Sequence, residues 1–396
     1  MNDVQIGVLI AAAALVAAVV AIPPTRRQGR AAGVEAKVAE FKKRFIELRQ
    51  SQIELSDGVL RASDPSWRAH DVPMLTRAGW IFDHPVPIDE IEVEFVSESA
   101  SDDSRTNVTV PAHALLEGLD LSGPITYSDA VTRIAGMSHF TNGVIYRPLQ
   151  MTANDLGVHL TFEASKYFGY LDTSEVLAYK EMQSSGSNRY RKHLRDPFNL
   201  SNRVASLGIL TLTILRNGNR PATFVLHKRT AKVVLGSDLY HVIPAGEFTP
   251  SDLSQTAIRE DLSLWRNICR EYAEELLGDL DAQGDGGRKI DYANSEPYQS
   301  LNMALRNGQL DVYALGFGLD PLSWKPELLT VAIFDAGTFD KIFGTKIVGN
   351  YEGKVILGEQ FNPMTLRNYV EGGSTRPGAK ACLRLAWRHR SALGLT

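Results

Sequence analysis

Cysteine is scarce in this sequence, because Cys269 and Cys382 are the only two among 396 residues. They lie far apart, and neither belongs to a CxxC pair. This argues against a disulfide framework and against a zinc knuckle, and it fits a protein of a reducing compartment. HxH and HExxH spacings are also missing around the histidines of the predicted strands and the middle region, which are His139, His159, His227 and His241. A histidine-based metal site is therefore not predicted.

An excess of charge of either sign is lacking too. The chain has 42 basic and 46 acidic residues, which gives a net charge of −4. A protein that binds nucleic acid by bulk electrostatics would be strongly basic, so nucleic acid is not an expected partner. Hydrophobic residues make up 44% and charged residues 22%, which is typical of a globular protein long enough for two domains.

The one long run without charge is residues 4–22, VQIGVLIAAAALVAAVVAI. Nineteen such residues are close to the length that spans a bilayer as a helix. Positive charge does not precede this run, as it would in a cleaved signal peptide, but follows it in Arg26, Arg27 and Arg30. The positive-inside rule then predicts a single-pass membrane protein whose soluble body lies in the cytoplasm. The alternative is a buried or interfacial helix.

The rest of the chain divides into segments that differ in their pattern of apolar and polar residues. Apolar residues recur at helical spacing in residues 25–60, which predicts a juxtamembrane helix that could also self-associate into a homo-oligomer. Residues 72–180 alternate apolar and polar positions and carry no catalytic signature, so we assign them to a smaller α+β accessory domain. Residues 182–203 are predicted to be a linker or an ordered crossing segment. Residues 204–396 combine strands with two substantial helices, which predicts an α/β domain.

Within that domain the strand signals are consecutive. Strands are predicted at 207–216, 222–229 and 239–248, and again at 310–320 and 327–335, with helices at 262–277 and 378–390. Gly316 and Gly318 form a GxG that lacks the rest of a dinucleotide fingerprint. A turn or a β-bulge is the better interpretation.

The helix predicted at 262–277 contains the largest group of candidate functional residues. Its apolar positions recur at three- and four-residue spacing, which predicts a core-facing stripe, whereas Glu271, Glu274 and Glu275 share a neighbouring face. Like charges at this spacing destabilise a helix by roughly 0.2–0.5 kcal/mol per pair unless a positive group lies among them. Arg270 can supply part of that charge, and a divalent cation with oxygen ligands can supply the rest. The alternative is an ordinary solvated acidic face.

The segment Arg270-Glu271-Tyr272-Ala273-Glu274-Glu275 resembles the R-E-U-x-E-E core of the Nudix box. The upstream segment LYHVIPAGEF resembles the strand and turn that precede this box in the family, with Gly246 as its first glycine, and ATFVLHKR is similar to the strand before that. Three features depart from the motif. About ten extra residues separate Gly246 from Arg270, Leu262 stands where the motif has its first glutamate, and the terminal glycine, Gly278, comes one position late.

The resemblance implies a Nudix-like α/β/α sandwich that hydrolyses a nucleoside diphosphate derivative with Mg²⁺ or Mn²⁺. It assigns Glu271, Glu274 and Glu275 as metal ligands or water-positioning groups, and Arg270 as the residue that orients them. No single general base is assigned, because an acidic residue on another loop can take that role. The candidates for it are Glu247, Glu296 and Glu327.

Substrate contacts are expected from Gly246, from Lys228 and from Arg229, although the two basic residues could equally be solvated strand ends. Tyr240, Phe248 and Trp324 could stack on a base, but aromatic residues in strand-rich domains more often belong to the core.

Three hypotheses follow for the function. The first is a membrane-anchored Nudix-type hydrolase. The second is a Nudix-fold sensor that binds a nucleotide such as an ADP-ribose derivative without hydrolysing it. The third is a membrane scaffold that binds neither metal nor nucleotide. The altered spacing favours the sensor over the enzyme, whereas the retained arginine and three glutamates favour the enzyme.

Overall fold

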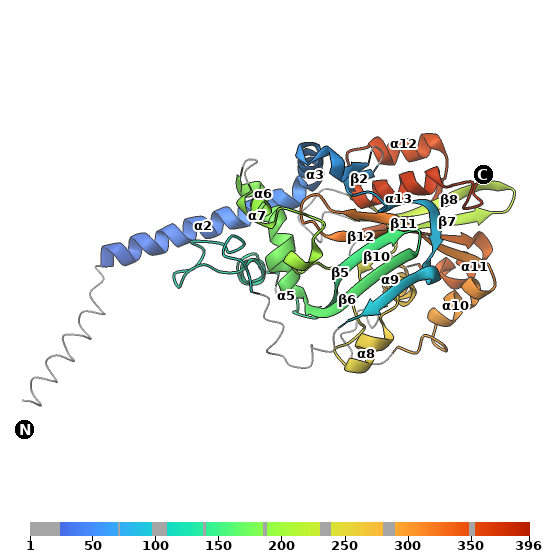
Figure 1. Ribbon diagram of the computed structural model, residues 1–396, viewed down its shortest axis with the longest axis horizontal. Helices are drawn as coiled ribbons and strands as arrows, with labels where there is room; N and C mark the ends of the chain where they lie inside the picture. The colour runs from blue at the N-terminus through green and yellow to red at the C-terminus, as the bar shows by residue number, and fades with distance from the viewer. Residues whose placement is uncertain are drawn as a thin grey trace, which may run out of the picture.

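The computed structural model describes residues 24–69, 72–96, 109–137, 140–184, 188–229, 239–279, 290–347 and 353–396. The predicted transmembrane segment, residues 4–22, lies outside them. Within the described ranges, no helix is both long enough and apolar enough for a membrane crossing. A long helix, α2 (Pro24–Gln50), extends from the rest of the molecule toward the N-terminal side (Figure 1).

A mixed, curled sheet of ten strands forms the centre of the molecule. Its main path runs β1-β2-β11-β12-β7-β8-β13, while β3 pairs with β11, β10 with β7 and β9 with β8. Strands β7 and β12 are parallel, with Glu327 opposite Gly208. The strands are β1 (Arg68–Ala69), β2 (Val72–Leu75), β3 (Ile81–Pro87), β7 (Gly208–Asn217), β8 (Arg220–Arg229), β9 (Leu239–Val242), β10 (Ala245–Glu247), β11 (Leu310–Leu319), β12 (Pro326–Asp335) and β13 (Gly353–Gln360).

Helices cover both faces of this sheet because its central strands are apolar on both sides. In β7, Leu210 and Leu212 pack in one hydrophobic cluster, whereas Ile209 packs in the other. This is the alternation expected for a strand buried between two layers. The first cluster includes α13 (Pro377–Arg388), beside α12 (Pro363–Glu371), and the second includes α9 (Leu264–Leu277), α10 (Tyr298–Arg306) and α11 (Ala336–Ile342).

The expectation of an α/β architecture is thus confirmed at the level of a mixed sheet with helices. The helix predicted at 262–277 begins at Leu264, and the predicted strand at 239–248 is divided into β9 and β10. The extra residues before α9 contain a short helix, α8 (Gln255–Glu260). The segment predicted as a linker or crossing, 182–203, contains α7 (Arg189–Leu194) and is an ordered crossing in its described part.

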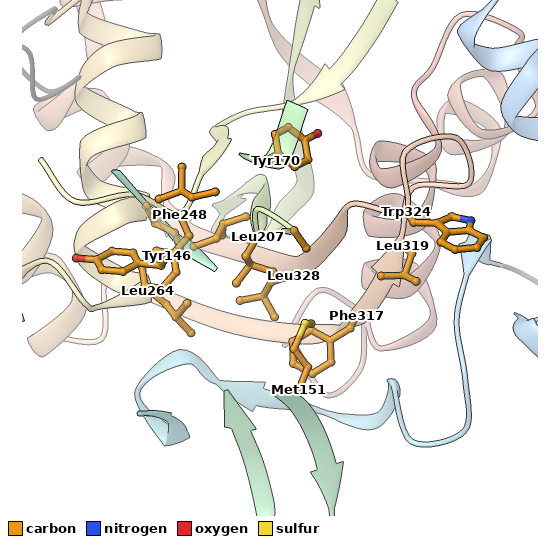
Figure 2. Packing of buried hydrophobic residues seen from close by; sticks show 14 of the residues in the cluster. Tyr146, Met151, Tyr170, Leu207, Phe248, Leu264, Phe317, Leu319, Trp324 and Leu328 are labelled. Atoms are coloured by element: carbon orange, nitrogen blue, oxygen red, sulfur yellow. The ribbon is translucent and has the colours of Figure 1, made fainter. Parts of the chain in front are cut away.

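The middle of the chain forms a second sheet of three strands, in the order β4-β6-β5. Its strands are β4 (Ile91–Phe95), β5 (Val144–Asn154) and β6 (Gly157–Lys166). Between β4 and β5 the chain forms α4 (Tyr127–Asp129) and a π-helical turn, η4 (Ala130–Ile134). After β6 it forms α5 (Tyr167–Tyr170), a second π-helical turn, η5 (Leu171–Glu175), and α6 (Val176–Ser184). Its core is continuous with that of the larger sheet. Tyr146 of β5 packs against Phe248, and Met151 lies beside Phe317 of β11 (Figure 2).

The predicted division between an accessory domain at 72–180 and a domain at 204–396 does not coincide with a break in this structure. Strands β2 and β3 belong to the first range by sequence, yet both pair with β11 of the second. One hydrophobic cluster also runs through both ranges. Residues 72–87 therefore complete the larger sheet.

Residues 24–62 form two helices, α2 and α3 (Gln52–Ala62), which we call the stem. The predicted helix at 25–60 thus corresponds to two helices that meet near Ser51. Phe41, Phe45 and Leu48 of α2 are buried against the middle region, and Phe41 packs on Tyr179 of α6 with ring centroids 4.9 Å apart. Only the second half of α2 is thereby held to the rest of the molecule.

The GxG in β11 is a β-bulge, as the sequence indicates, since the register with β12 shifts between Ala314 and Gly316. Gly316 has a φ of +151°, and a Cβ there would lie 2.6 Å from the Trp80 carbonyl oxygen. We expect Gly316→Ala to lower the free energy of unfolding by about 2 kcal/mol. Urea denaturation of the full chain measures this. Gly58→Ala in α3, where a Cβ meets nothing within 4 Å, is the control and should be neutral or stabilising.

Candidate functional site

Helix α9 forms because its sequence supplies both ends and an apolar face. Ser263 caps its start, with the side chain accepting a hydrogen bond from the Arg266 amide at 3.3 Å. Gly278 ends it in the left-handed conformation that glycine adopts without strain. Ile268, Tyr272 and Leu276 are buried beneath the sheet, as predicted from their spacing. The acidic face of α9 is therefore turned toward the strand β10.

Two of the three predicted glutamates contact β10 and the turn before it. Glu275 is 5% exposed, and its Oε2 accepts a hydrogen bond from the Ala245 amide at 3.1 Å. The Glu271 carboxylate lies against Gly246, where a Cβ would come within 1.9 Å of its Cδ. The third, Glu274, is partly exposed on the same helix. Gly246 is thus a position of close approach between strand and helix, which explains why a glycine is needed there.

Arg270 contacts the segment that follows β10. It is 4% exposed, and it donates hydrogen bonds to the Thr249 carbonyl and, at 2.9 Å, to Asn267 Oδ1. Asn267 Oδ1 in turn accepts from the Thr249 amide at 3.3 Å. These contacts fix the chain that leaves β10. The predicted role of Arg270, the orientation of the glutamates, stays a prediction.

A divalent metal was predicted among these glutamates. In the parts of the chain that the structure describes, no three His, Cys, Asp or Glu side chains are placed together to hold a metal ion. The Ala245 amide donates a hydrogen bond to Glu275, and the Glu271 carboxylate lies against Gly246. The binding of Mg²⁺ or Mn²⁺ by these glutamates stays a prediction, and we derive no chemical step through a metal ion.

Of the predicted substrate contacts, Gly246 lies against α9, whereas Lys228 lies elsewhere on the sheet. Lys228 lies over the ring of Tyr240, 5.7 Å from its centroid, on the side of the sheet that faces α12, and Tyr240 packs on Tyr369. The side chain of Arg229 is not among those described. Phe248 is fully buried between aromatic residues of the three-stranded sheet, so it belongs to the core.

A charged cavity of about 290 Å³ lies on the other side of β10. Side chains alternate along a strand, so Glu247 points away from α9 while Gly246 faces it. Glu247 lies in this cavity, where its Oε1 contacts Lys325 Nζ at 2.5 Å and its other oxygen accepts from the Ser206 hydroxyl. Glu327, the next candidate for a general base, also lines the cavity. The third, Glu296, instead accepts a hydrogen bond from Ser300 at the surface.

Burial changes the pKa values of the ionisable side chains in this cavity. It raises the pKa of Glu327 to about 7, even though Lys325 opposes the change. Burial also raises the pKa of Glu175, which accepts a hydrogen bond from the Tyr170 hydroxyl at 2.8 Å. Burial would lower the pKa of Lys325, but Glu247 and Glu327 outweigh it, and the net pKa is raised. The lysine is therefore a permanent cation, while Glu327 titrates near neutrality.

The loop that carries Lys325 is fixed by two arginines from the crossing segment. Arg191 donates to the carbonyls of Pro321, at 2.9 Å, and Leu322, while Arg203 donates to that of Trp324 at 2.8 Å. Both guanidinium groups lie on the Trp324 ring, at 5.1 and 5.5 Å from its centroid. Trp324 is thus a buried part of this loop. These contacts place the ammonium group before any ligand binds.

Sequence reasoning did not identify Lys325 as a functional residue, nor Arg49, Glu175 and Arg376, which also line the cavity. They come from four distant segments, and none belongs to a motif. The one local signal was the charged pair in KPE, residues 325–327, directly before a buried strand. Comparison with protein-family models finds no match for this chain, and comparison with curated proteins finds none either.

Proposed function

We propose that the chain is a Nudix-fold sensor that binds a nucleoside diphosphate derivative, of the ADP-ribose type, without hydrolysing it. The Nudix-type assignment is supported by the order of strand, turn and acidic helix, and by helices on both faces of a mixed sheet with β7 parallel to β12. It also rests on the sequence resemblance of residues 270–275. In this proposal the chain is held at the membrane through residues 4–22, with its body in the cytoplasm.

The contacts that the glutamate carboxylates make favour binding over hydrolysis. Glu275 accepts a hydrogen bond from the Ala245 amide, the Glu271 carboxylate lies against Gly246, and Glu247 forms an ion pair with Lys325. The Lys325 ammonium group thus offsets the charge of Glu247, which a divalent cation would otherwise have to offset. Such a pocket can bind a phosphate ester through its own cations.

Hydrolysis is the second candidate, and one observation favours it. Glu271 and Glu274 both remain partly exposed beside the turn at Gly246, so a bound phosphate could bring a metal ion to them. In that case Mg²⁺ or Mn²⁺ would bind together with the substrate.

The full chain, in detergent or nanodiscs, is incubated with ADP-ribose, NAD-type dinucleotides and nucleoside triphosphates, with Mg²⁺ or with Mn²⁺. For a sensor, we expect at least one compound to raise the melting temperature while no nucleoside monophosphate is released. Metal-dependent release that is lost in the double variant Glu274→Gln, Glu275→Gln would establish the hydrolase instead. Failure of every compound to bind would refute both and leave the scaffold hypothesis.

A further inference from the structure

The charged cavity lies between three parts of the chain. Its walls come from the stem, from the middle region that includes η4 and η5, and from the loop between β11 and β12 together with the start of α13. Small-molecule sites usually enclose about 300–1,000 Å³, so this cavity is at the lower end of that range. It has room for one nucleotide-sized group, and the stem closes one side of it.

Two arginines from distant segments of the chain line the cavity. Arg49 belongs to the stem, where its guanidinium lies over Phe45 at 4.6 Å from the ring centroid. Arg376 precedes α13, and its backbone amide donates to the Tyr240 carbonyl at 3.1 Å, which ties it to the sheet. Its side chain reaches Gln52 of the stem at 3.4 Å. Guanidinium groups bind phosphate oxygens with paired hydrogen bonds, so two of them in one cavity suit a diphosphate.

Two carboxylates of the cavity are engaged with groups other than the two arginines. Glu247 is paired with Lys325, and Asp320 accepts hydrogen bonds from the Leu322 and Ser323 amides within its own loop. Glu175 and Glu327 have raised pKa values, because burial disfavours their charged forms. Carboxyl groups such as these can form hydrogen bonds with the hydroxyl groups of a sugar.

Aromatic side chains supply the remaining wall. Tyr167 and Tyr170 have ring centroids 5.7 Å apart, and Phe140 packs edge-on against Tyr167 at 6.0 Å. All three line the cavity, together with Tyr127. A planar base can pack on such rings. The wall composition therefore matches a ligand that combines a base, a hydroxylated sugar and a diphosphate.

We infer that this cavity is the nucleotide site and that the ligand's diphosphate bridges Arg49 of the stem and Arg376 of the body. This deepens the proposed function and rests on it. Because the stem continues toward residues 4–22, occupation of the cavity fixes the stem relative to the larger sheet. The bound state then differs from the free state in the orientation of α2, which is the signal.

Isothermal titration of ADP-ribose and of inorganic pyrophosphate into the full chain tests the two arginines. We expect Arg49→Gln and Arg376→Gln each to weaken ADP-ribose binding by at least about tenfold. Arg44→Gln is the matched control. It lies on the same helix, pairs with Glu40 outside the cavity and should bind as the unmodified chain does. Pyrophosphate should bind more weakly, with the same dependence on both arginines.

Movement of the stem is measured with one spin label at Lys42→Cys in α2 and another at Met364→Cys in α12. Both positions are exposed. Cys269 and Cys382 are buried, so the introduced thiols react first. ADP-ribose should narrow the distance distribution between the labels. If Arg376→Gln weakens binding while Arg49→Gln does not, or if the distribution is unchanged by the ligand, the stem is not part of the site, yet the sensor proposal stands. If nothing binds, the sensor proposal itself fails.

Discussion

Lys325→Met should lower the free energy of unfolding by about 3 kcal/mol at pH 8, because it removes the lysine that pairs with Glu247 and offsets the charge of Glu327. The Lys325 side chain is 18% exposed and that of Glu247 31%, so solvent screening reduces the effect below that of a fully buried pair. Methionine keeps most of the volume of the side chain, so packing changes little. Chemical denaturation of the full chain measures the loss.

The exposed Lys346→Met is the matched control and should change stability little. Addition of Glu247→Gln to Lys325→Met should restore part of the loss, since it removes one of the two unpaired charges. A change no larger than that of the control would contradict the role of Lys325 as the counter-ion of the cavity.

Glu327→Gln should stabilise the protein by about 2–3 kcal/mol above pH 7 and leave it nearly unchanged near pH 4.5. The pKa of Glu327 is raised from 4.5 to about 7 by burial. Between those values the folded state binds more protons than the unfolded state, so this residue makes stability fall as pH rises. Asp172, with a pKa raised by burial from 3.8 to about 6, acts in the same direction at lower pH. Glutamine removes the contribution of Glu327 alone.

Denaturation midpoints from pH 4.5 to pH 8 measure this difference. Glu371→Gln, on the exposed end of α12, is the control and should leave the pH profile as it is. Parallel profiles for Glu327→Gln and the unmodified chain would show that Glu327 keeps an ordinary pKa, and the account of the cavity's charge would then be wrong.

The parts of the fold that the sequence could predict are those set by local pattern. The core stripe of α9 and the strands β7, β8, β11 and β12 follow from periodicity over consecutive residues. The bulge at Gly316 follows from a glycine pair inside an apolar run. These features depend on neighbours along the chain, which the sequence displays directly.

The parts that could not be predicted depend on long-range packing. Nothing local indicates that β2 and β3 pair with β11, more than two hundred residues later. In the same way, Arg49, Glu175, Lys325 and Arg376 line one cavity only because four distant segments fold together. The acidic motif was visible in the sequence, but the hydrogen bond from Ala245 to Glu275 was not, since it requires the register of β10 against α9.

In the proposed function, the stem connects the ligand site to the membrane. Its buried half packs on α6 through Phe41, while its other half is exposed and leads to residues 4–22. A ligand that bridges Arg49 and Arg376 would add contacts to the buried half only. Its effect on the exposed half would then be a change in the average direction of a rigid helix, not a new contact.

Titration of ADP-ribose into the full chain in the presence of EDTA tests the central claim most directly. The account predicts that ADP-ribose binds with the same affinity in EDTA as in Mg²⁺, and that it is recovered intact after prolonged incubation with Mg²⁺ or Mn²⁺. Binding that appears only with a divalent metal, followed by release of a nucleoside monophosphate, would contradict it and would make the glutamates of α9 catalytic.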